Sequence, residues 1–427
     1  MSPRSFRFPV VNAMLLLAGL FYAASATADW PQFQGPTRDG FSTETGLARV
    51  WPECGPKTLW RTTVQEGFGG PAIRDGQVFF LDRVDSARDM LRCLDLASGE
   101  ELWTVAYDAP GSTSHNGSRT TPTVTQTHIY VVGLMGHFSS INRATRAIDW
   151  QINLKAVYGQ VDPKWGFAQS PALYKDLVIV APQSPNGFVA AYRQDTGQRV
   201  WASEGLGSEG YSSPLVTTLA GVDQVVMIAG PGGRAGSVHG LSLEDGRTLW
   251  SYGGWECRIP IPNATPLPED RLFITGEYGA GSAMIRIARN GDTFSVKELY
   301  KTDDMESQIH QPLPIGEVLY ANSNGNKRAD GMICMTLDGD VRWRTRDNRD
   351  LPQFERGNLL FADGMILNLD GRTGILHLVS PSIEGYEELA RAQVLDGQKI
   401  WSPMALSDGK LVLRSQSEMK CLDLRNP

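Results

Sequence analysis

The sequence predicts an all-β protein, a β-propeller of about eight blades with four antiparallel strands in each. The main observation is a repeating unit that opens with a proline and closes near a tryptophan. The units recur about every 47 residues, the length of one propeller blade. No sustained helical periodicity follows the first 28 residues. The marker prolines are Pro71, Pro122, Pro171, Pro214, Pro266, Pro312 and Pro403, and the marker tryptophans are Trp103, Trp150, Trp201, Trp250 and Trp343.

Each unit divides into short candidate strands. In the second unit these are HIYVVGL, HFSSINRA and RAIDWQI, with glycine, aspartate and asparagine between the strands of each unit. Alternating or β-branched runs of about five or six residues between such turn residues are typical of strands. Four-stranded units arranged around an axis expose only short sheet edges, which favours a propeller.

Two units depart from the pattern. The unit that begins at Asn358 contains LLFADGMILNLDGRTGILHLV and has neither marker residue. The fifth unit has Leu299 and Tyr300 where the others have tryptophan. Both keep their hairpins, so both still count as blades.

The two ends of the chain together predict how the ring closes. The last unit stops at CLDLRNP, after its third strand. A matching fourth strand, KTLWRTTV, lies at Lys57 to Val64 and places Trp60 at the marker position. Pairing this N-terminal strand into the last blade would close the ring and offset the entropy of holding the ends together.

The N-terminus resembles a secretory signal. Arg4 and Arg7 precede an apolar stretch, and Ala26-Thr27-Ala28 forms a small-x-small cleavage site. The apolar stretch is shorter than the ~20 residues of a membrane span. We therefore expect a signal peptide over 1–28, cleaved after Ala28, an N-terminal extension over 29–56 and a propeller over 57–427. The expected location is periplasmic or extracellular, with no transmembrane segment in the mature chain.

Charge and cysteine content narrow the function further. The formal net charge is −7, and loss of the two N-terminal arginines makes it more negative, which disfavours nucleic acid as a partner. We expect a monomer. Of the five cysteines, Cys93, Cys334 and Cys421 occupy the same repeat position and are predicted to lie in the core. Cys54 and Cys257 fall in loops, and no disulfide framework is evident.

Three units end in LDLASGEELW, YRQDTGQRVW and LSLEDGRTLW. A tryptophan after such a turn resembles the PQQ-like repeat of bacterial quinoprotein dehydrogenases and of the outer-membrane assembly factor BamB. The resemblance covers about Lys57 to Leu424. The stretch WPQFQGPTRDG, from Trp30 to Gly40, is similar to the start of a group of exported bacterial PQQ-like propeller proteins. The resemblance implies either a non-catalytic scaffold or a dehydrogenase that uses PQQ and calcium.

The connections before the marker prolines are expected to meet at one mouth of the central channel, where binding would concentrate. Their aromatic, guanidinium, amide and imidazole groups suit a neutral or weakly anionic ligand. Packing that fills the channel is the alternative role for each of these side chains. The candidates are Phe68, His115, Arg119, Trp165, Tyr211, Trp255, Arg258, His310, Gln311, Arg356 and Trp401, with Asn116 and Phe354 beside them. The inserts over 153–169 and 251–264 are candidate lid or docking loops.

No catalytic or metal-binding residue is predicted. The six histidines are scattered without a local ligand pair, and no Gly-x-Ser-x-Gly motif occurs. The dehydrogenases of the family commonly carry adjacent cysteines, and this sequence has none. We therefore expect an exported binding or assembly scaffold without a cofactor, whose partner is a protein segment or a polysaccharide. The alternative is a PQQ- and calcium-dependent dehydrogenase of alcohols or sugars.

Overall fold

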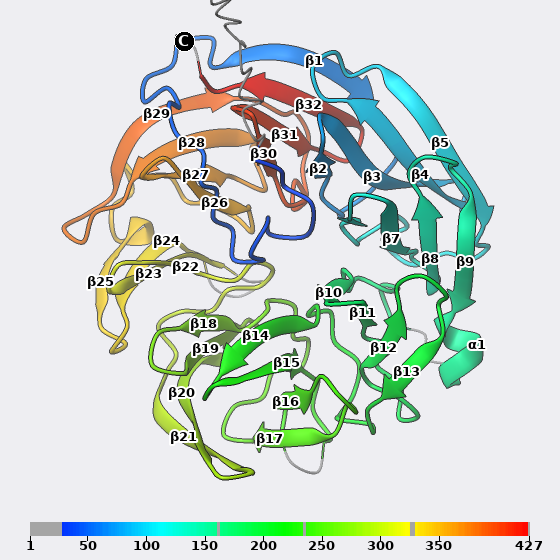
Figure 1. Cartoon of the computed structure of the whole chain (residues 1–427). Helices are drawn as coiled ribbons and strands as arrows, with labels where there is room; N and C mark the ends of the chain where they lie inside the picture. The colour runs from blue at the N-terminus through cyan, green and yellow to red at the C-terminus, as the bar shows by residue number, and fades with distance from the viewer. Residues whose placement is uncertain (1–27, 160–162, 234–235, 325–328, 426–427) are drawn as a thin grey trace, which may run out of the picture.

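The computed structural model describes residues 28–159, 163–233, 236–324 and 329–425. In this part of the chain, eight four-stranded sheets surround a central channel (Figure 1). Every pairing within the sheets is antiparallel, as in the hairpin β3–β4 and the pair β31–β32. The predicted all-β, eight-bladed propeller is confirmed. The predicted signal peptide lies outside the described residues except for Ala28, and no helix within them is long and apolar enough to span a membrane.

Each blade runs from an inner strand at the channel to an outer strand at the rim. Blades 1 to 4 consist of β2 (Ala72–Arg74), β3 (Gln77–Val84), β4 (Arg88–Asp95) and β5 (Glu101–Asp108); β6 (Thr123–Val124), β7 (His128–Val132), β8 (His137–Asn142) and β9 (Ile148–Asn153); β10 (Ala172–Tyr174), β11 (Leu177–Val180), β12 (Ala190–Arg193) and β13 (Arg199–Ala202); and β14 (Leu215–Leu219), β15 (Val222–Ile228), β16 (Val238–Ser242) and β17 (Thr248–Tyr252).

Blades 5 to 8 follow the same order, and the last blade takes its outer strand from the N-terminus. They consist of β18 (Thr265–Leu267), β19 (Arg271–Gly276), β20 (Gly281–Asn290) and β21 (Thr293–Thr302); β22 (Leu313–Ile315), β23 (Val318–Asn324), β24 (Ala329–Thr336) and β25 (Val341–Arg344); β26 (Leu359–Ala362), β27 (Met365–Leu369), β28 (Ile375–Ser380) and β29 (Glu387–Gln393); and β30 (Ala405–Ser407), β31 (Lys410–Arg414), β32 (Glu418–Asp423) and β1 (Lys57–Thr63). One short α-helix, α1 (Leu154–Tyr158), and one 3₁₀ turn, η1 (Thr345–Asp347), interrupt the strands.

The ring closes as the sequence predicted. Strand β1 pairs antiparallel with β32, and Trp60 lies opposite Cys421 in the register. A buried ion network reinforces this junction, because Asp82 of blade 1 contacts both Arg414 of blade 8 and Arg92 of its own blade. The first and last blades are thus held by backbone pairing and by charge.

The hydrophobic core lies between neighbouring blades. One cluster joins Phe79 and Leu91 of blade 1 to Ile129 and Ile141 of blade 2. The predicted core cysteines Cys93, Cys334 and Cys421 are all buried, and so is Cys257. All five cysteines are free thiols.

The marker tryptophans pack across the seams between blades. The ring of Trp201 covers the Gly246 turn of the next blade, and its Nε1 donates to the carbonyl of Leu243 at 3.0 Å. Tyr300 takes the same place in blade 5, against Gly339 of blade 6. The departure in the fifth unit therefore substitutes one aromatic wedge for another.

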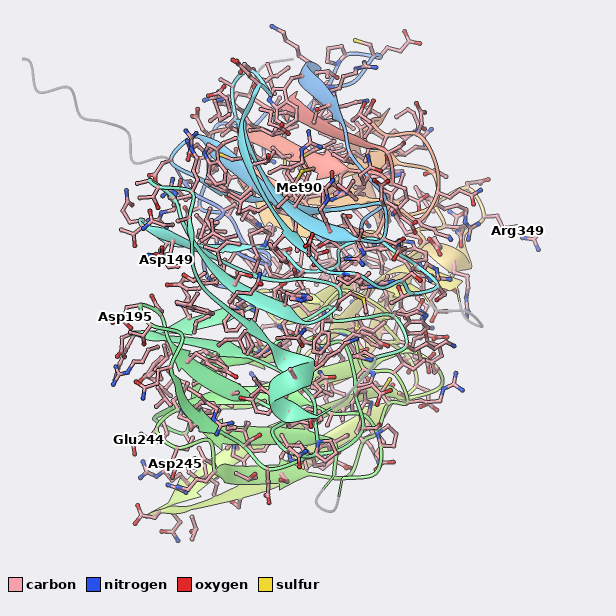
Figure 2. The ribbon with its side chains drawn as sticks, turned by 90° about the vertical axis from the view of Figure 1, so that its right-hand side faces the viewer. Met90, Asp149, Asp195, Glu244, Asp245 and Arg349 are labelled. Atoms are coloured by element: carbon pink, nitrogen blue, oxygen red, sulfur yellow. The ribbon has the colours of Figure 1, made fainter. Side chains whose placement is uncertain are left out.

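The connections of a blade divide between two faces. Figure 2 shows Asp195 and Asp245, from turns between third and fourth strands, on one face, and Arg349, from a connection between blades, on the other. We call the first the turn face and the second the mouth face. The wedge tryptophans border the turn face.

The N-terminal extension winds through the channel. Trp30 forms an antiparallel bridge with Ile73 of blade 1, and Phe41 a parallel bridge with Phe361 of blade 7. Between them Arg38, only 5% exposed, donates to the carbonyl of Pro171 at 2.9 Å. In Figure 1 this segment is the dark blue loop at the centre of the ring. The extension therefore fills the channel beneath the mouth face.

Candidate functional site

A belt of hydrogen bonds fixes the connections on the mouth face. The backbone N–H of Thr121 donates to Ser170 Oγ, that of Ser170 to Ser213 Oγ, and that of Ser213 to Asn263 Oδ1, at 2.8–2.9 Å. The N–H of Gly70 donates to Thr121 Oγ1 at 3.2 Å. Four of these residues, Gly70, Thr121, Ser170 and Ser213, directly precede a marker proline. These bonds link the connections before blades 1 to 4 each to the following connection, which holds the mouth side chains there in place.

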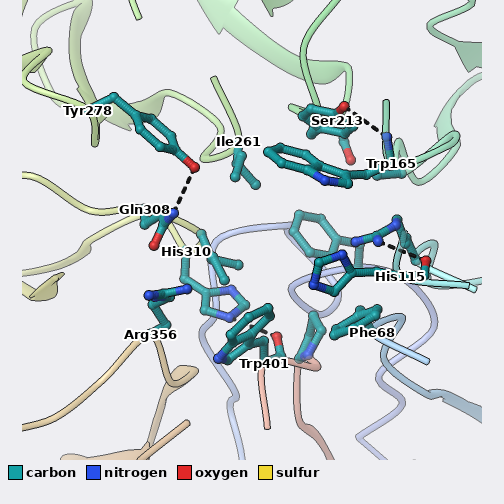
Figure 3. Close-up of a pocket in the computed structure, with 16 residues that line it drawn as sticks. Phe68, His115, Trp165, Ser213, Ile261, Tyr278, Gln308, His310, Arg356 and Trp401 are labelled. Carbon is teal, nitrogen blue, oxygen red and sulfur yellow. Dashed lines mark hydrogen bonds between the residues drawn. The ribbon is translucent and has the colours of Figure 1, made fainter. Parts of the chain in front are cut away.

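One cavity of about 370 Å³ opens inside this belt, within the size range of small-molecule sites (Figure 3). Most of the predicted mouth residues meet here. Those that line the cavity are Phe68, His115, Arg119, Trp165, Tyr211, His310, Arg356 and Trp401. They come from seven different connections.

Three predicted mouth residues do not line the cavity. Trp255 is 3% exposed and donates from Nε1 to the carbonyl of Gly281 at 3.2 Å, as a core residue does. Gln311 donates to the carbonyl of Arg38 at 3.0 Å and so anchors the N-terminal extension. Arg258 lies outside the cavity, 5.3 Å from the ring centroid of Tyr278.

Several residues that line the cavity were not predicted from the sequence. Phe33 belongs to the N-terminal extension, and its path through the channel has no local sequence signal. Tyr278 lies in the β19–β20 hairpin turn, whereas the predicted site residues all lie in connections between blades. Gln308 precedes His310 by two residues, so alternation along an extended chain would have placed the two on one side. Both lie on the left wall of the cavity in Figure 3.

Aromatic rings and guanidinium groups form one continuous stack along the cavity. Phe68 and Trp401 stack with centroids 5.7 Å apart at 27°. Arg119 lies 4.7 Å from the Phe68 centroid, and Arg356 lies 5.1 Å from that of Trp401. Cation–π attraction of this kind contributes about 0.5–2 kcal/mol per pair.

A second aromatic pair forms another wall. The ring centroids of Trp165 and Tyr211 lie 5.2 Å apart, and the Tyr211 hydroxyl accepts a hydrogen bond from the backbone N–H of Trp165 at 3.3 Å. Trp165 comes from the insert over 153–169, and Ile261 of the insert over 251–264 also lines the cavity. Both inserts that were expected to be lid or docking loops thus contribute to the site.

The histidines of the cavity are held in their neutral form. Burial lowers the pKa of His310 to about 4. Burial, together with the nearby charge of Arg119, lowers the pKa of His115. At neutral pH the positive charge of the lining therefore resides on Arg119 and Arg356.

A second cavity, of about 660 Å³, lies among turns of blades 5, 6 and 7. It is lined by charged residues such as Arg271, Glu317 and Asp338 and contains none of the predicted site residues. Among the residues that the structure describes, no group of three or more His, Cys, Asp or Glu side chains could hold a metal ion.

Comparison with known proteins places the chain in a family. The model of a family described as outer membrane protein assembly factor BamB matches residues 55–214 and 90–345, more than half of the chain. The chain belongs to this BamB-like, PQQ-repeat propeller family. The resemblance seen in the sequence is confirmed. No curated protein matches the chain.

Solved structures show how widely this propeller fold is shared. A europium-containing methanol dehydrogenase is 12% identical, with a TM-score of 0.66 over 90% of this chain and 89% of the other. BamB from Moraxella catarrhalis is 14% identical, with a TM-score of 0.58 over 87% and 98%. A quinohemoprotein alcohol dehydrogenase from Comamonas testosteroni is 11% identical, with a TM-score of 0.64 over 94% and 81%. At such identity, membership of the BamB-like family and these likenesses establish the fold and leave the activity open.

Proposed function

We propose that this BamB-like propeller is an exported, non-catalytic binding scaffold that holds a protein segment or a polysaccharide at its channel mouth. The observation that carries the proposal is the lining of the mouth cavity. Aromatic rings stand on its walls, and guanidinium, imidazole and amide groups lie between them. Such a lining suits flat or extended ligands.

The alternative, a PQQ- and calcium-dependent dehydrogenase, fits these residues poorly. Calcium prefers several oxygen ligands, with carboxylates prominent among them. Within the ranges that the structure describes, no aspartate or glutamate lines the cavity. The nearby carboxylate of Glu355 is engaged with Arg356 at 2.8 Å and accepts from Trp401 Nε1 at 3.3 Å. The donor set therefore favours ligand capture over a calcium-bound quinone.

A capture experiment tests the proposal. Envelope polysaccharide fractions and a peptide array would be probed with the wild-type protein and with the double variant Trp165→Ala/Trp401→Ala. We expect the variant to lose retention and to keep its fold, whereas Ile383→Ala, an exposed position at the second cavity, retains full binding. Saturable binding of PQQ with Ca²⁺ and turnover of an alcohol or sugar with a dye acceptor would overturn the scaffold function.

A further inference from the structure

The charged side chains that line the mouth cavity are all positive. Two guanidinium groups and no carboxylate are among its lining residues in the described part of the chain. Arg356 is already paired, because its Nε lies 2.8 Å from Glu355 Oε1. Arg119 differs, since it forms no ion pair within the described residues and its Nε is buried without a hydrogen-bond partner. Arg119 is therefore the cation that remains available to a ligand.

The surroundings of Arg119 favour the binding of an anion. Its Nη2 donates to the carbonyl of His115 at 3.0 Å, and its guanidinium lies over the ring of Phe68. Burial lowers its pKa to about 10, so it stays charged at neutral pH while it is partly removed from water. The exposed acid Glu66 attracts it without forming an ion pair. Charge-assisted hydrogen bonds to such a group are stronger than those between neutral groups.

A second buried cation lies beneath the cavity. Arg38 of the N-terminal extension donates to the backbone carbonyls of Pro171, Ser170 and Pro214 and has no carboxylate partner among the described residues. Its guanidinium lies 5.9 Å from the ring centroid of Phe33, and Phe33 lines the cavity. Because the extension fills the channel at this level, Phe33 closes the cavity on the channel side, and the Arg38 guanidinium lies beyond that ring. The cavity suits the end of a chain better than a segment that passes through.

The opposite wall offers an unused acceptor. Gln308 is 7% exposed and donates from Nε2 to the Tyr278 hydroxyl at 2.9 Å. Its Oε1 is buried and has no partner. A buried amide oxygen without a partner is destabilising, and a ligand hydroxyl that donates to it would remove this cost. Trp165 and Trp401 provide flat surfaces on two other sides (Figure 3).

We propose that the mouth binds the acidic end of a saccharide chain: Arg119 pairs with the sugar carboxylate, Gln308 accepts from a hydroxyl, and the aromatic walls cover the faces of the ring. This inference rests on the proposed function and names its ligand class. An acidic peptide would satisfy Arg119 equally well. The saccharide is favoured because several aromatic planes and an unpartnered amide acceptor surround one cavity.

Calorimetric titration would test the inference with three probes: trigalacturonate, the neutral galactotriose and triglutamate. We expect trigalacturonate to bind about tenfold more tightly than galactotriose at low salt, as one charge-assisted contact implies. Arg119→Gln should remove this preference and lower the affinity for trigalacturonate to about that for galactotriose. Arg119→Lys should restore part of it, and Arg356→Gln should reduce it less, because Arg356 is already paired. Melting temperatures would confirm that each variant is folded.

Other outcomes would overturn the inference in distinguishable ways. Equal affinity for the two saccharides, both dependent on Trp401, would refute the preference for an acidic saccharide and leave the proposed scaffold function intact. Binding of triglutamate alone would assign the mouth to a peptide. Failure of all three probes to bind the folded wild-type protein would refute the saccharide end, while PQQ turnover would refute the proposed function itself.

Discussion

Tryptophans on the two faces of this propeller have the same chemistry and different surroundings. On the turn face, Nε1 of Trp60, Trp150 and Trp343 donates to a backbone carbonyl of the next blade at 2.8–3.0 Å. On the mouth face, Trp401 stacks on Phe68 and its Nε1 reaches the Glu355 carboxylate at 3.3 Å. The first arrangement recurs at several seams, Trp201 included, whereas the second belongs to the cavity alone.

This difference separates the residues that hold the fold from those that can bind. A repeated wedge is positioned by the same kind of turn wherever it occurs, so it serves assembly of the ring. A ring that contacts the side chains of two other connections, as Trp401 does, is positioned for the cavity that they share. The comparison makes graded predictions about stability.

The largest effect is expected from removal of the wedge strand that the N-terminus supplies. A chain that begins at Gln65 lacks β1, Trp60 and the extension that fills the channel. It leaves β32 as an open edge and the seam between blades 8 and 1 unsealed. We expect calorimetry to show no cooperative unfolding, whereas a chain that begins at Asp29 melts as one unit. A cooperative transition at the same temperature in both chains would contradict the closure.

The next prediction compares one tryptophan from each face directly. Trp201→Ala should lower the free energy of unfolding by about 3–5 kcal/mol, because it empties a buried seam. Trp401→Ala should lower it by no more than about 1 kcal/mol, because that ring borders an open cavity. Urea denaturation of the two variants measures both values. Similar losses for the two variants would place Trp401 in the structural core.

The sequence predicts the turn face better than the mouth face, for a physical reason. The wedge is a local feature, in which one hairpin places its aromatic residue on the next one, so the repeat reveals it even where Tyr300 replaces tryptophan. The cavity is assembled from separate connections and from an extension that crosses the channel. Phe33 therefore could not be foreseen, and Gln311, next to His310, turns to the extension instead.

Acid should weaken the protein through histidines that are buried in neutral form. Burial lowers the pKa of both His310 and His239 to about 4, from the usual 6.5. Between these pH values the unfolded chain binds protons that the folded chain does not, so stability falls as pH falls from about 6.5 to 4. Each group contributes about 3 kcal/mol over this window.

Variants assign the acid effect to one site. His310→Gln should reduce the difference in melting temperature between pH 7 and pH 4.5. The matched control is His128→Gln, because the His128 ring is partly exposed and pairs with Asp149 at 2.9 Å. If the two variants lose stability in acid as steeply as the wild type, His310 does not sense pH in the mouth.

The smallest effect isolates the wedge contact from backbone strain. Gly246 and Gly221 have nearly the same backbone angle, φ of 75° and 73°. A Cβ at Gly246 would meet the Trp201 ring at 2.5 Å, whereas a Cβ at Gly221 would meet nothing within 4 Å. Alanine at either position pays about 1 kcal/mol for the left-handed conformation. Only Gly246→Ala should lose about 1–3 kcal/mol more, through overpacking of the seam.

Urea denaturation of both variants gives this difference in the free energy of unfolding. The difference should disappear in a Trp201→Ala background, where the ring that the new methyl would strike is absent.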